Sequence, residues 1–239
     1  MLELSNVTFL YAPEKGLSEA SLKASAGEVI GVVGGNGAGK STLLGLIAGA
    51  LVPQVGHIGL TVTDLHGRTK RFDSATGVGY RRHVGYLTER SPVFLEMSVG
   101  RYLRFRARLR GERFLRIRRR VNEAMERCGL QDLRKERLGT FSHGLIRRVA
   151  LAEALLTLPQ ILVLDDPFSG IDAAMRASFI RVIQDVSQRS HVFISGHDPE
   201  MLAACCTRFA WVDHARLVAD RLTFDEVLER LSPSPKVLP

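Results

Sequence analysis

The sequence predicts an α/β fold in which a parallel sheet is flanked by helices. Short apolar runs, typical of buried strands, occupy residues 29–33, 161–164 and 191–195. Residues 41–48 and 145–158 have the pattern of helices. Strands that alternate with helices favour parallel pairing, because each helix carries the chain back across the sheet.

The length and composition bound the class of protein. At 239 residues the chain can form one α/β domain or a compact two-lobed one, and its 45% hydrophobic and 24% charged residues are typical of a globular protein. No apolar run reaches the roughly 18 residues of a membrane span, because the longest candidate, residues 149–164, contains Glu153 and Pro159. We find no signal peptide and no C-x-x-C pair among the three cysteines. We therefore expect a soluble, cytosolic protein with free thiols.

A glycine-rich loop joins the first apolar run to the first predicted helix. Residues 34–41 read Gly-Gly-Asn-Gly-Ala-Gly-Lys-Ser, which fits the phosphate-binding pattern G-x-x-x-x-G-K-[S/T]. Glycines let successive N–H groups converge on phosphate oxygens, and the helix N-terminus adds partial positive charge. We expect Lys40 to reach the β- and γ-phosphates and the Ser41 hydroxyl to bind Mg²⁺. The residues assigned to the nucleotide are Gly34, Gly35, Asn36, Gly37, Ala38, Gly39, Lys40, Ser41 and Thr42.

Two carboxylates follow the second apolar run. Asp165 and Asp166 stand at the carboxyl end of the strand predicted at residues 161–164. An acid at this end of a strand, beside a phosphate loop, binds Mg²⁺ directly or through water, and we assign that role to Asp165. Asp166 is placed to polarise the attacking water. An ordinary polar strand end is the alternative, and the phosphate loop in the same chain argues against it.

An arginine-rich segment separates these two motifs. Residues 99–128 have a helical pattern, and between Arg101 and Arg120 the chain carries ten arginines and one acid, Glu112. Such a basic stripe is typical of contact with nucleic acid or with an anionic membrane surface. A solvated helix face is an equally good interpretation, since no aromatic platform is interleaved with the charges.

Taken together, these motifs resemble an ATP-binding-cassette (ABC) ATPase over residues 2–231. Residues 141–145 read Phe-Ser-His-Gly-Leu and precede a basic helix, which is similar to the LSGGQ signature loop of the family. The resemblance implies that Ser142 and Gly144 contact the γ-phosphate of an ATP held by a second subunit. The third and fifth positions depart from the pattern, but a hydroxyl and N–H groups at a helix start still suit an anion. A capped helix without that role is the alternative.

The resemblance assigns three further positions. Tyr11 falls where an aromatic ring of the family stacks on adenine, with a core tyrosine as the alternative. Residues 169–172 resemble the loop that communicates across the dimer. His197 follows the third apolar run and resembles the switch histidine that contacts the γ-phosphate. A lone histidine is usually structural, but its place after a buried strand favours the functional role.

Two carboxylates depart from the family pattern. Glu89 replaces the glutamine of the family's glutamine loop, and Asp166 replaces its usual catalytic glutamate. The resemblance implies ATP hydrolysis with Asp166, His197 and Glu89 as catalytic residues, and with Mg²⁺ at Ser41, Asp165 and Glu89. Because both replacements bear on catalysis, we expect the hydrolysis to be slow.

The segment around Glu89 indicates a subclass. Residues 84–99 and 102–111 resemble the GYLPE…P-Y-x-x-M-T-V…YLxFxAxLxG segment of ATPases that serve ABC-2 type permeases, which include exporters. The chain is thus expected to power export through a separate permease.

The resemblance implies a P-loop α/β core with an N-terminal antiparallel β lobe and a helical lobe inserted at about residues 91–150. We expect one domain over residues 1–231 and a flexible tail at 232–239. The expected ligands are ATP and Mg²⁺. The expected partners are a transmembrane permease and a second ATPase subunit, identical or different, which place the chain at the cytoplasmic side of the membrane; no nucleic acid is expected. Two alternatives stay open, namely a slow regulatory ATP switch and a nucleic-acid-associated ABC ATPase.

Overall fold

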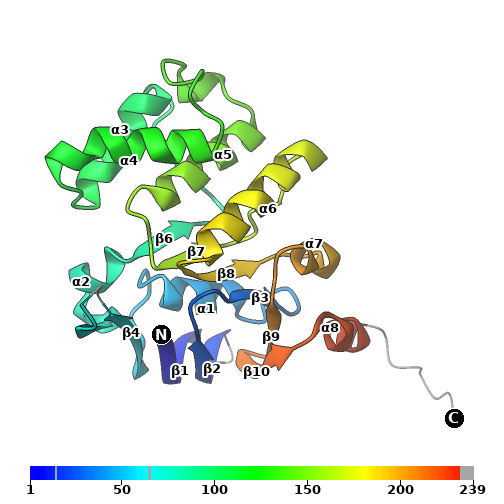
Figure 1. The fold of residues 1–239 in the computed structure, drawn as a ribbon. Coiled ribbons are helices and arrows are strands. Elements are labelled where there is room, and N and C mark those ends of the chain that lie inside the picture. The colour runs from blue at the N-terminus through cyan, green and yellow to red at the C-terminus, as the bar shows by residue number, and fades with distance from the viewer. Residues whose placement is uncertain (14, 64–65, 232–239) are drawn as a thin grey trace, which may run out of the picture.

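A computed structural model describes residues 1–13, 15–63 and 66–231 of the chain. Within these ranges ten strands form one sheet, in the order β5-β4-β1-β2-β10-β9-β3-β8-β7-β6 (Figure 1). The strands are β1 (Leu2–Ala12), β2 (Lys15–Ala24), β3 (Val29–Val33), β4 (Val55–Thr63), β5 (Thr69–Asp73), β6 (Val84–Leu87), β7 (Ile161–Leu164), β8 (His191–Ser195), β9 (Arg208–Asp213) and β10 (Arg216–Leu222). The helices are α1 (Lys40–Ile47), α2 (Val78–Arg81), α3 (Val99–Leu109), α4 (Phe114–Arg127), α5 (His143–Leu155), α6 (Ala173–Ser187), α7 (Pro199–Ala203) and α8 (Phe224–Leu231).

The parallel part of the sheet confirms the predicted α/β class. β9, β3, β8, β7 and β6 pair in parallel with their neighbours in that order. The three apolar runs predicted as strands are β3, β7 and β8, over the same residues, and every residue in them is buried. Burial on both faces explains why these strands read as continuous apolar runs.

The helix predicted at residues 145–158 is displaced toward the N-terminus. α5 begins at His143, because the Ser142 hydroxyl oxygen accepts a hydrogen bond from the Leu145 N–H at 3.4 Å and caps the helix. α5 ends at Leu155, three residues earlier than predicted. The chain then turns at Leu158, whose φ of 47° is incompatible with a continuing helix.

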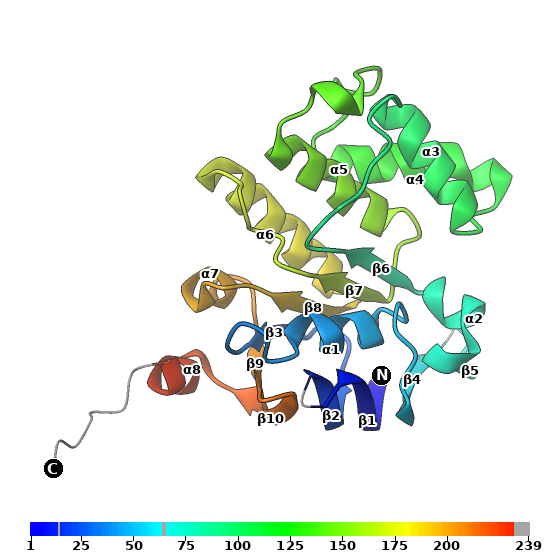
Figure 2. The same ribbon diagram turned by 180° about the vertical axis from the view of Figure 1, so that it is seen from behind.

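The predicted N-terminal antiparallel lobe is confirmed. β1 pairs antiparallel with β2 and β4, and β4 pairs antiparallel with β5. Buried side chains from β1, β2 and β4 pack with those of α1 and with one face of the parallel strands. Figure 2 shows α1 between the parallel strands and the β1–β2 layer, so the helix that follows the phosphate loop is held from both sides.

α3, α4 and α5 form a helical lobe at the other side of the parallel strands (Figure 1). α4 buries Ile117, Val121, Ala124 and Met125, which lie on one helical face. These side chains form a continuous core with α3, α5, α6 and the second face of β3, β7 and β8. The limits 1–231 and 91–150 stay predictions, and the tail expected to be flexible at 232–239 lies outside the described residues.

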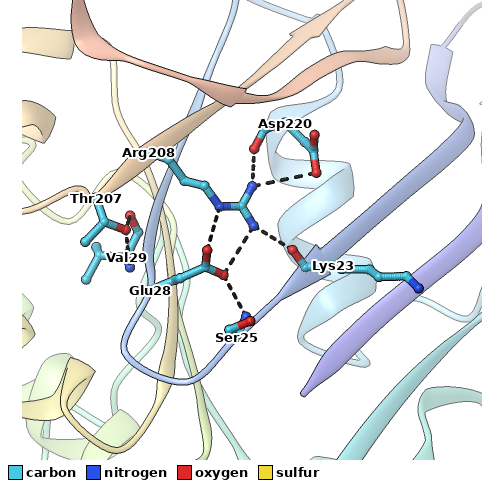
Figure 3. Close-up of polar contacts among 7 residues, drawn as sticks. All are labelled: Lys23, Ser25, Glu28, Val29, Thr207, Arg208 and Asp220. Atoms are coloured by element: carbon cyan, nitrogen blue, oxygen red, sulfur yellow. Dashed lines mark hydrogen bonds and ion pairs between the residues drawn. The ribbon is translucent and has the colours of Figure 1, made fainter.

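Buried Arg208 holds the start of β3 in place through several polar contacts. Its guanidinium lies 3.1 Å from Glu28 Oε1 and donates to the backbone carbonyls of Lys23 and Asp220 (Figure 3). Burial raises the pKa of Glu28, but a hydrogen bond from the Ser25 N–H and the charge of Arg208 outweigh it, so the pKa lies below its usual value. Because β3 runs straight into the glycine-rich loop, these contacts fix the strand from which the loop departs.

The three cysteines are free, as expected. Cys128 and Cys205 are buried, and Cys206 is partly buried. Burial raises the pKa of Cys128 to about 12, so its thiol is protonated and unreactive at neutral pH.

None of the helices that the structure describes combines the length and apolar character needed to cross a bilayer.

Candidate functional site

A cavity of about 500 Å³ lies at the carboxyl ends of β3, β7 and β8. Ligands of open α/β sheets bind at this edge, because the loops that leave the strands converge there. The cavity joins segments that are far apart in the sequence: the glycine-rich loop, the two carboxylates and the histidine after β8. Its lining residues are Tyr11, Lys15, Gly16, Asn36, Gly37, Gly39, Lys40, Ser41, Thr42, Glu89, Asp165, Asp166, Ser195, Gly196 and His197.

The glycine-rich loop can take its shape only with glycine at two of its positions. Gly34 has a φ of 150° and Gly39 a φ of 114°. A Cβ at Gly34 would collide with the carbonyl oxygen of Val212, and one at Gly39 with that of Gly16. The loop is therefore packed directly against β9 and the start of β2, which holds its N–H groups around the cavity.

The side chain of Lys40 folds back over the loop. It donates hydrogen bonds to the carbonyl oxygens of Gly34 and Gly35 at 2.9 and 2.8 Å. Burial lowers the pKa of Lys40, while the charges of Asp165 and Asp166 act in the opposite direction. A cation held between the loop and two carboxylates is placed to meet phosphate oxygens that enter the cavity.

Asp165 is buried beside two hydroxyls. The Ser41 hydroxyl donates to Asp165 Oδ1 at 3.2 Å, and the Ser195 hydroxyl donates to the same oxygen at 2.6 Å. The Ser195 oxygen also accepts the backbone N–H of Asp166 at 3.0 Å. Sequence reasoning missed Ser195, although a hydroxyl at the end of β8 lies next to carboxylates at the end of β7 in any parallel pairing of these strands.

Asp166 faces His197 from a left-handed backbone. Its φ is 49°, and its Oδ2 lies 3.8 Å from His197 Nε2. Burial raises the pKa of the Asp166 carboxyl; His197 and Arg147 oppose this rise, and Asp165 and Glu89 add to it. The carboxylate and the imidazole thus lie side by side at the cavity wall, where both face the space that a phosphate and a water molecule would enter.

Arg147 connects the helical lobe to this wall and was also missed. It belongs to α5, is buried, and donates to the carbonyl oxygen of Thr88 at 2.8 Å. Burial lowers the pKa of Arg147, and the charges of Asp166, Glu89 and Asp165 oppose that shift. The sequence did contain a signal, because Arg147 lies on an otherwise apolar helical face. A buried arginine needs a polar partner.

Ser142 and Gly144 lie apart from the cavity, at the start of α5 in the helical lobe. The Ser142 oxygen caps α5, and Gly144 packs so closely on Met175 that a Cβ would lie 3.1 Å from its Cε. The structure therefore does not bring the signature loop to the phosphate loop of the same chain.

Tyr11, by contrast, lines the cavity and is 64% exposed, so the alternative of a core tyrosine is wrong.

The oxygen atoms near Asp165 fit Mg²⁺. Among the described residues no group of three or more His, Cys, Asp or Glu side chains could hold a metal. Mg²⁺ is commonly bound by one or two protein groups together with phosphate oxygens and water. Ser41 and Asp165, which are hydrogen-bonded to each other, and Glu89, which lines the same cavity, offer that smaller set of hard oxygen ligands.

Comparison with known proteins agrees with the geometry. Residues 17–169 match the family described as ABC transporter. The chain is 29% identical over 197 residues to the uncharacterized ABC transporter ATP-binding protein YxlF of Bacillus subtilis, which covers 82% of this chain and 62% of YxlF. It is 30% identical over 219 residues to the sulfate/thiosulfate import ATP-binding protein CysA of Synechococcus elongatus, which covers 90% of this chain and 61% of CysA. It thus spans about three fifths of the length of these two relatives.

A third relative and a solved structure match over most of their length. The lipopolysaccharide export system ATP-binding protein LptB of Escherichia coli is 29% identical over 225 residues, which covers 91% of this chain and 89% of LptB. The structure of an ATP binding subunit of an ABC transporter superposes with a TM-score of 0.80 at 24% identity and covers 97% of this chain and 93% of that one. At this identity the superposition shows the shared fold.

Proposed function

Because this chain belongs to the ABC transporter family, we propose that it binds and hydrolyses ATP as one subunit of a multi-subunit transporter. The observation that carries the proposal is the single cavity around which Lys40, Asp165, Asp166 and His197 meet. A cation, a pair of carboxylates and an imidazole beside converging loop N–H groups are the parts that phosphoryl transfer to water requires.

Each part has a role in hydrolysis. The loop N–H groups and Lys40 bind the phosphates and orient the γ-phosphate. Ser41 and Asp165 would hold Mg²⁺, which supplies positive charge against the phosphate oxygens when bound. Asp166 accepts a hydrogen bond from the attacking water and takes up its proton as the water oxygen bonds to the γ-phosphorus and the bond to ADP breaks. His197 donates to a γ-phosphate oxygen from beside Asp166, at the same wall of the cavity.

A second ATPase subunit completes the site in this proposal. Ser142 lies outside the cavity of its own chain, at the N-terminus of α5, where a hydroxyl and free N–H groups suit an anion. Two subunits arranged head to tail would each place Ser142 and Gly144 on the ATP held by the other. ATP then favours the paired state and its hydrolysis releases it, so the motion is driven by differential contacts to ATP and ADP.

We assign the chain to the ABC-2 exporter group, with a separate permease as its membrane partner. The support is the segment that contains Glu89 and continues into α3. The named relatives include both an import and an export protein, so they do not fix the direction. A groove of about 440 Å³ between α1, α2, β6 and α3 offers the permease a docking place at the junction of the lobes; its wall includes Arg81, Arg82, Leu109 and Arg110. Docking there would hold the chain at the cytoplasmic side of the membrane.

A slow regulatory ATP switch is the second candidate, and Asp166 is the observation that favours it. A carboxylate one methylene shorter than glutamate lies about 1.5 Å further from the γ-phosphate when the backbone is unmoved. A displacement of this size can lower turnover by about 10²-fold. Steady-state phosphate release by the chain in complex with its co-purified membrane partner separates a pump from a switch.

ATP binding and phosphate release by the purified chain test the shared part of both candidates. We expect MgATP to bind, and Lys40→Ala to weaken binding or turnover by at least about tenfold, since the ammonium is a point charge at the phosphates. Lys15→Ala, which also lines the cavity but lies outside the phosphate motif, serves as the comparison. Unchanged affinity and turnover in a folded Lys40→Ala protein would refute the phosphate-loop assignment.

A further inference from the structure

The hairpin between α3 and α4 carries the most exposed large apolar side chains of the described residues. Phe114 is 76% exposed and Leu115 is 89% exposed, and Leu109 across the hairpin is 64% exposed. The other apolar residues of α4, such as Ile117 and Val121, face the core. Phe114 and Leu115 therefore have no part in the packing of the helix that they begin.

Arginines of this hairpin fall into two groups. Arg106 and Arg110 pair with buried Glu153, Arg120 pairs with Glu112 and Glu123, and Arg119 pairs with Glu123. These contacts stabilise the lobe. The second group is exposed and makes no ion pair with any described residue; its members are Arg101, Arg104, Arg108, Arg113, Arg116 and Arg118.

The unpaired arginines flank the apolar pair. Arg113 directly precedes Phe114, Arg116 follows Leu115, and Arg118 lies one turn beyond Phe114 along α4. No side chain caps α4 and its first turn holds no acid, so the positive end of the helix dipole faces the same region. Guanidinium groups pair bidentately with phosphate, and the tip thus combines apolar and phosphate-binding chemistry.

We propose that this tip, residues 113–118, binds directly to an anionic lipid surface. Phe114 and Leu115 enter the boundary between headgroups and acyl chains, and the arginines hold lipid phosphates around them. An exposure of 89% means that Leu115 projects from the surface instead of lining a groove. A projection with an apolar tip and basic flanks suits a deformable lipid interface, whereas a protein segment would dock in the neighbouring concave groove. This inference goes beyond the ATPase function and does not depend on it.

Vesicle binding by the purified chain, without nucleotide, tests the proposal. The probes are vesicles of phosphatidylcholine alone and of phosphatidylcholine with about 30% phosphatidylglycerol. We expect binding to the anionic vesicles, weakened by salt, and little binding to the neutral ones. Free inorganic phosphate at the same total concentration should not compete, because it offers no apolar phase.

Two sets of variants locate the contact. Arg113→Gln/Arg116→Gln/Arg118→Gln should lower the partition coefficient by about 100-fold, and Phe114→Ser/Leu115→Ser by about tenfold. The matched controls remove the same charge from α6 and β10, or exposed apolar side chains from β4 and β10, and should bind as the wild type does. These controls are Arg181→Gln/Arg189→Gln/Arg221→Gln and Val55→Ser/Val218→Ser.

Insertion has a separate readout. A Phe114→Trp variant should show a blue-shifted fluorescence that brominated lipid quenches, and a Val218→Trp variant should not. If the triple arginine variant of the tip and the triple arginine control lose binding equally, net charge alone explains the binding and the proposal is wrong. Absence of binding to anionic vesicles would overturn it as well; if the tip variants then lose the co-purifying membrane partner, the tip is a protein contact. Circular dichroism of each variant establishes that it is folded.

Discussion

The hydroxyl of Ser195 joins the two carboxylates of the candidate site. It donates to Asp165 Oδ1 at 2.6 Å and accepts the backbone N–H of Asp166 at 3.0 Å. Both contacts follow from the parallel pairing of β7 with β8, which places the two strand ends side by side. One buried hydroxyl therefore fixes the direction of one acid and the backbone of the next.

Removal of this hydroxyl should lower turnover more than ATP affinity. In Ser195→Ala, Asp165 loses a short hydrogen bond and the Asp166 N–H loses its acceptor, and each loss leaves a buried polar group less well satisfied. We expect phosphate release to fall by about tenfold and the Mg²⁺ concentration for half-maximal activity to rise, with ATP affinity changed less than threefold. Titration of activity with Mg²⁺ at saturating ATP measures both effects.

Ser195→Thr is the matched control, because it keeps the hydroxyl and adds one methyl group. It should recover most of the lost turnover. If Ser195→Ala behaves as the wild type in both rate and Mg²⁺ requirement, the hydroxyl has no positioning role.

Ser195 also shows what the sequence could and could not predict. Lys40, Ser41, Asp165, Asp166 and His197 were predicted from motifs, and the structure brings all of them to one cavity. Of the residues assigned to the glycine-rich loop, Gly34, Gly35 and Ala38 do not line that cavity. Their strands were predicted because burial on both faces produces continuous apolar runs. Ser195 belongs to no motif, and its role depends on which strands are neighbours, which only the sheet order reveals.

Tertiary contacts explain the other differences. Arg147 is an arginine within an apolar helix, and its partner, the carbonyl of Thr88, is 59 residues away in the sequence. The early end of α5 depends on the turn at Leu158 that leads into β7. The segment with a helical pattern at residues 99–128 consists of two helices, α3 and α4, which are separated at Gly111, whose φ is 75°.

Ser142 predicts that ATP causes dimerisation. It lies outside the cavity of its own chain, so its contact with a γ-phosphate requires a second chain. We expect Asp166→Asn, which removes the proposed base, to be monomeric without nucleotide and dimeric with MgATP in sizing experiments. Adding Ser142→Arg should prevent the dimer while leaving ATP bound, because a long side chain blocks the close approach.

The outcome separates two kinds of pairing. A monomer at all concentrations of Asp166→Asn with MgATP would exclude the homodimer, and the partner would then be a different ATPase subunit. Dimerisation that is insensitive to Ser142→Arg would show that the signature loop lies outside the interface.

Buried His191 predicts a loss of stability in mild acid. Its side chain is 4% exposed, and among the described residues its Nδ1 has no hydrogen-bond partner. Burial lowers its pKa, and a hydrogen bond to the Ser25 backbone and the charge of Glu28 oppose the shift without cancelling it. The unfolded chain therefore binds a proton below about pH 6.5 that the folded chain does not.

The free energy of unfolding should therefore decrease as the pH falls. The contribution of neutral His191 to the free energy of unfolding is complete above about pH 6.5 and is lost as the pH falls from there toward the lower pKa of the folded chain. Denaturant unfolding at about pH 7.5 and about pH 5.5 should show a smaller decrease for His191→Gln than for the wild type. His57→Gln, at an exposed position, should keep the wild-type decrease; an equal decrease in all three would assign the pH dependence to other groups.

Asp166→Glu tests whether the short carboxylate limits turnover. General-base action needs about 2.6–3.2 Å between the carboxylate oxygen and the attacking water, or one intervening water, and the extra methylene restores about 1.5 Å of reach. The substitution should also lower the stability of the fold. The φ of Asp166 is 49°, and aspartate tolerates this left-handed region better than glutamate does. We expect turnover to rise by about tenfold, ATP affinity to stay within about twofold because the loop and Lys40 are unchanged, and Tm to fall by about 2–4 °C.

The measurements are single-turnover phosphate release and thermal unfolding of the same preparations. Asp166→Asn is the matched control, because it keeps the length of aspartate and the left-handed backbone but removes the base; it should abolish release without the loss of Tm. If Asp166→Glu lowers turnover or leaves it unchanged while Asp166→Asn abolishes it, the left-handed backbone already brings Asp166 to the water. The wild type would then hydrolyse ATP at an ordinary rate, and the slow regulatory switch would lose the observation on which it rests.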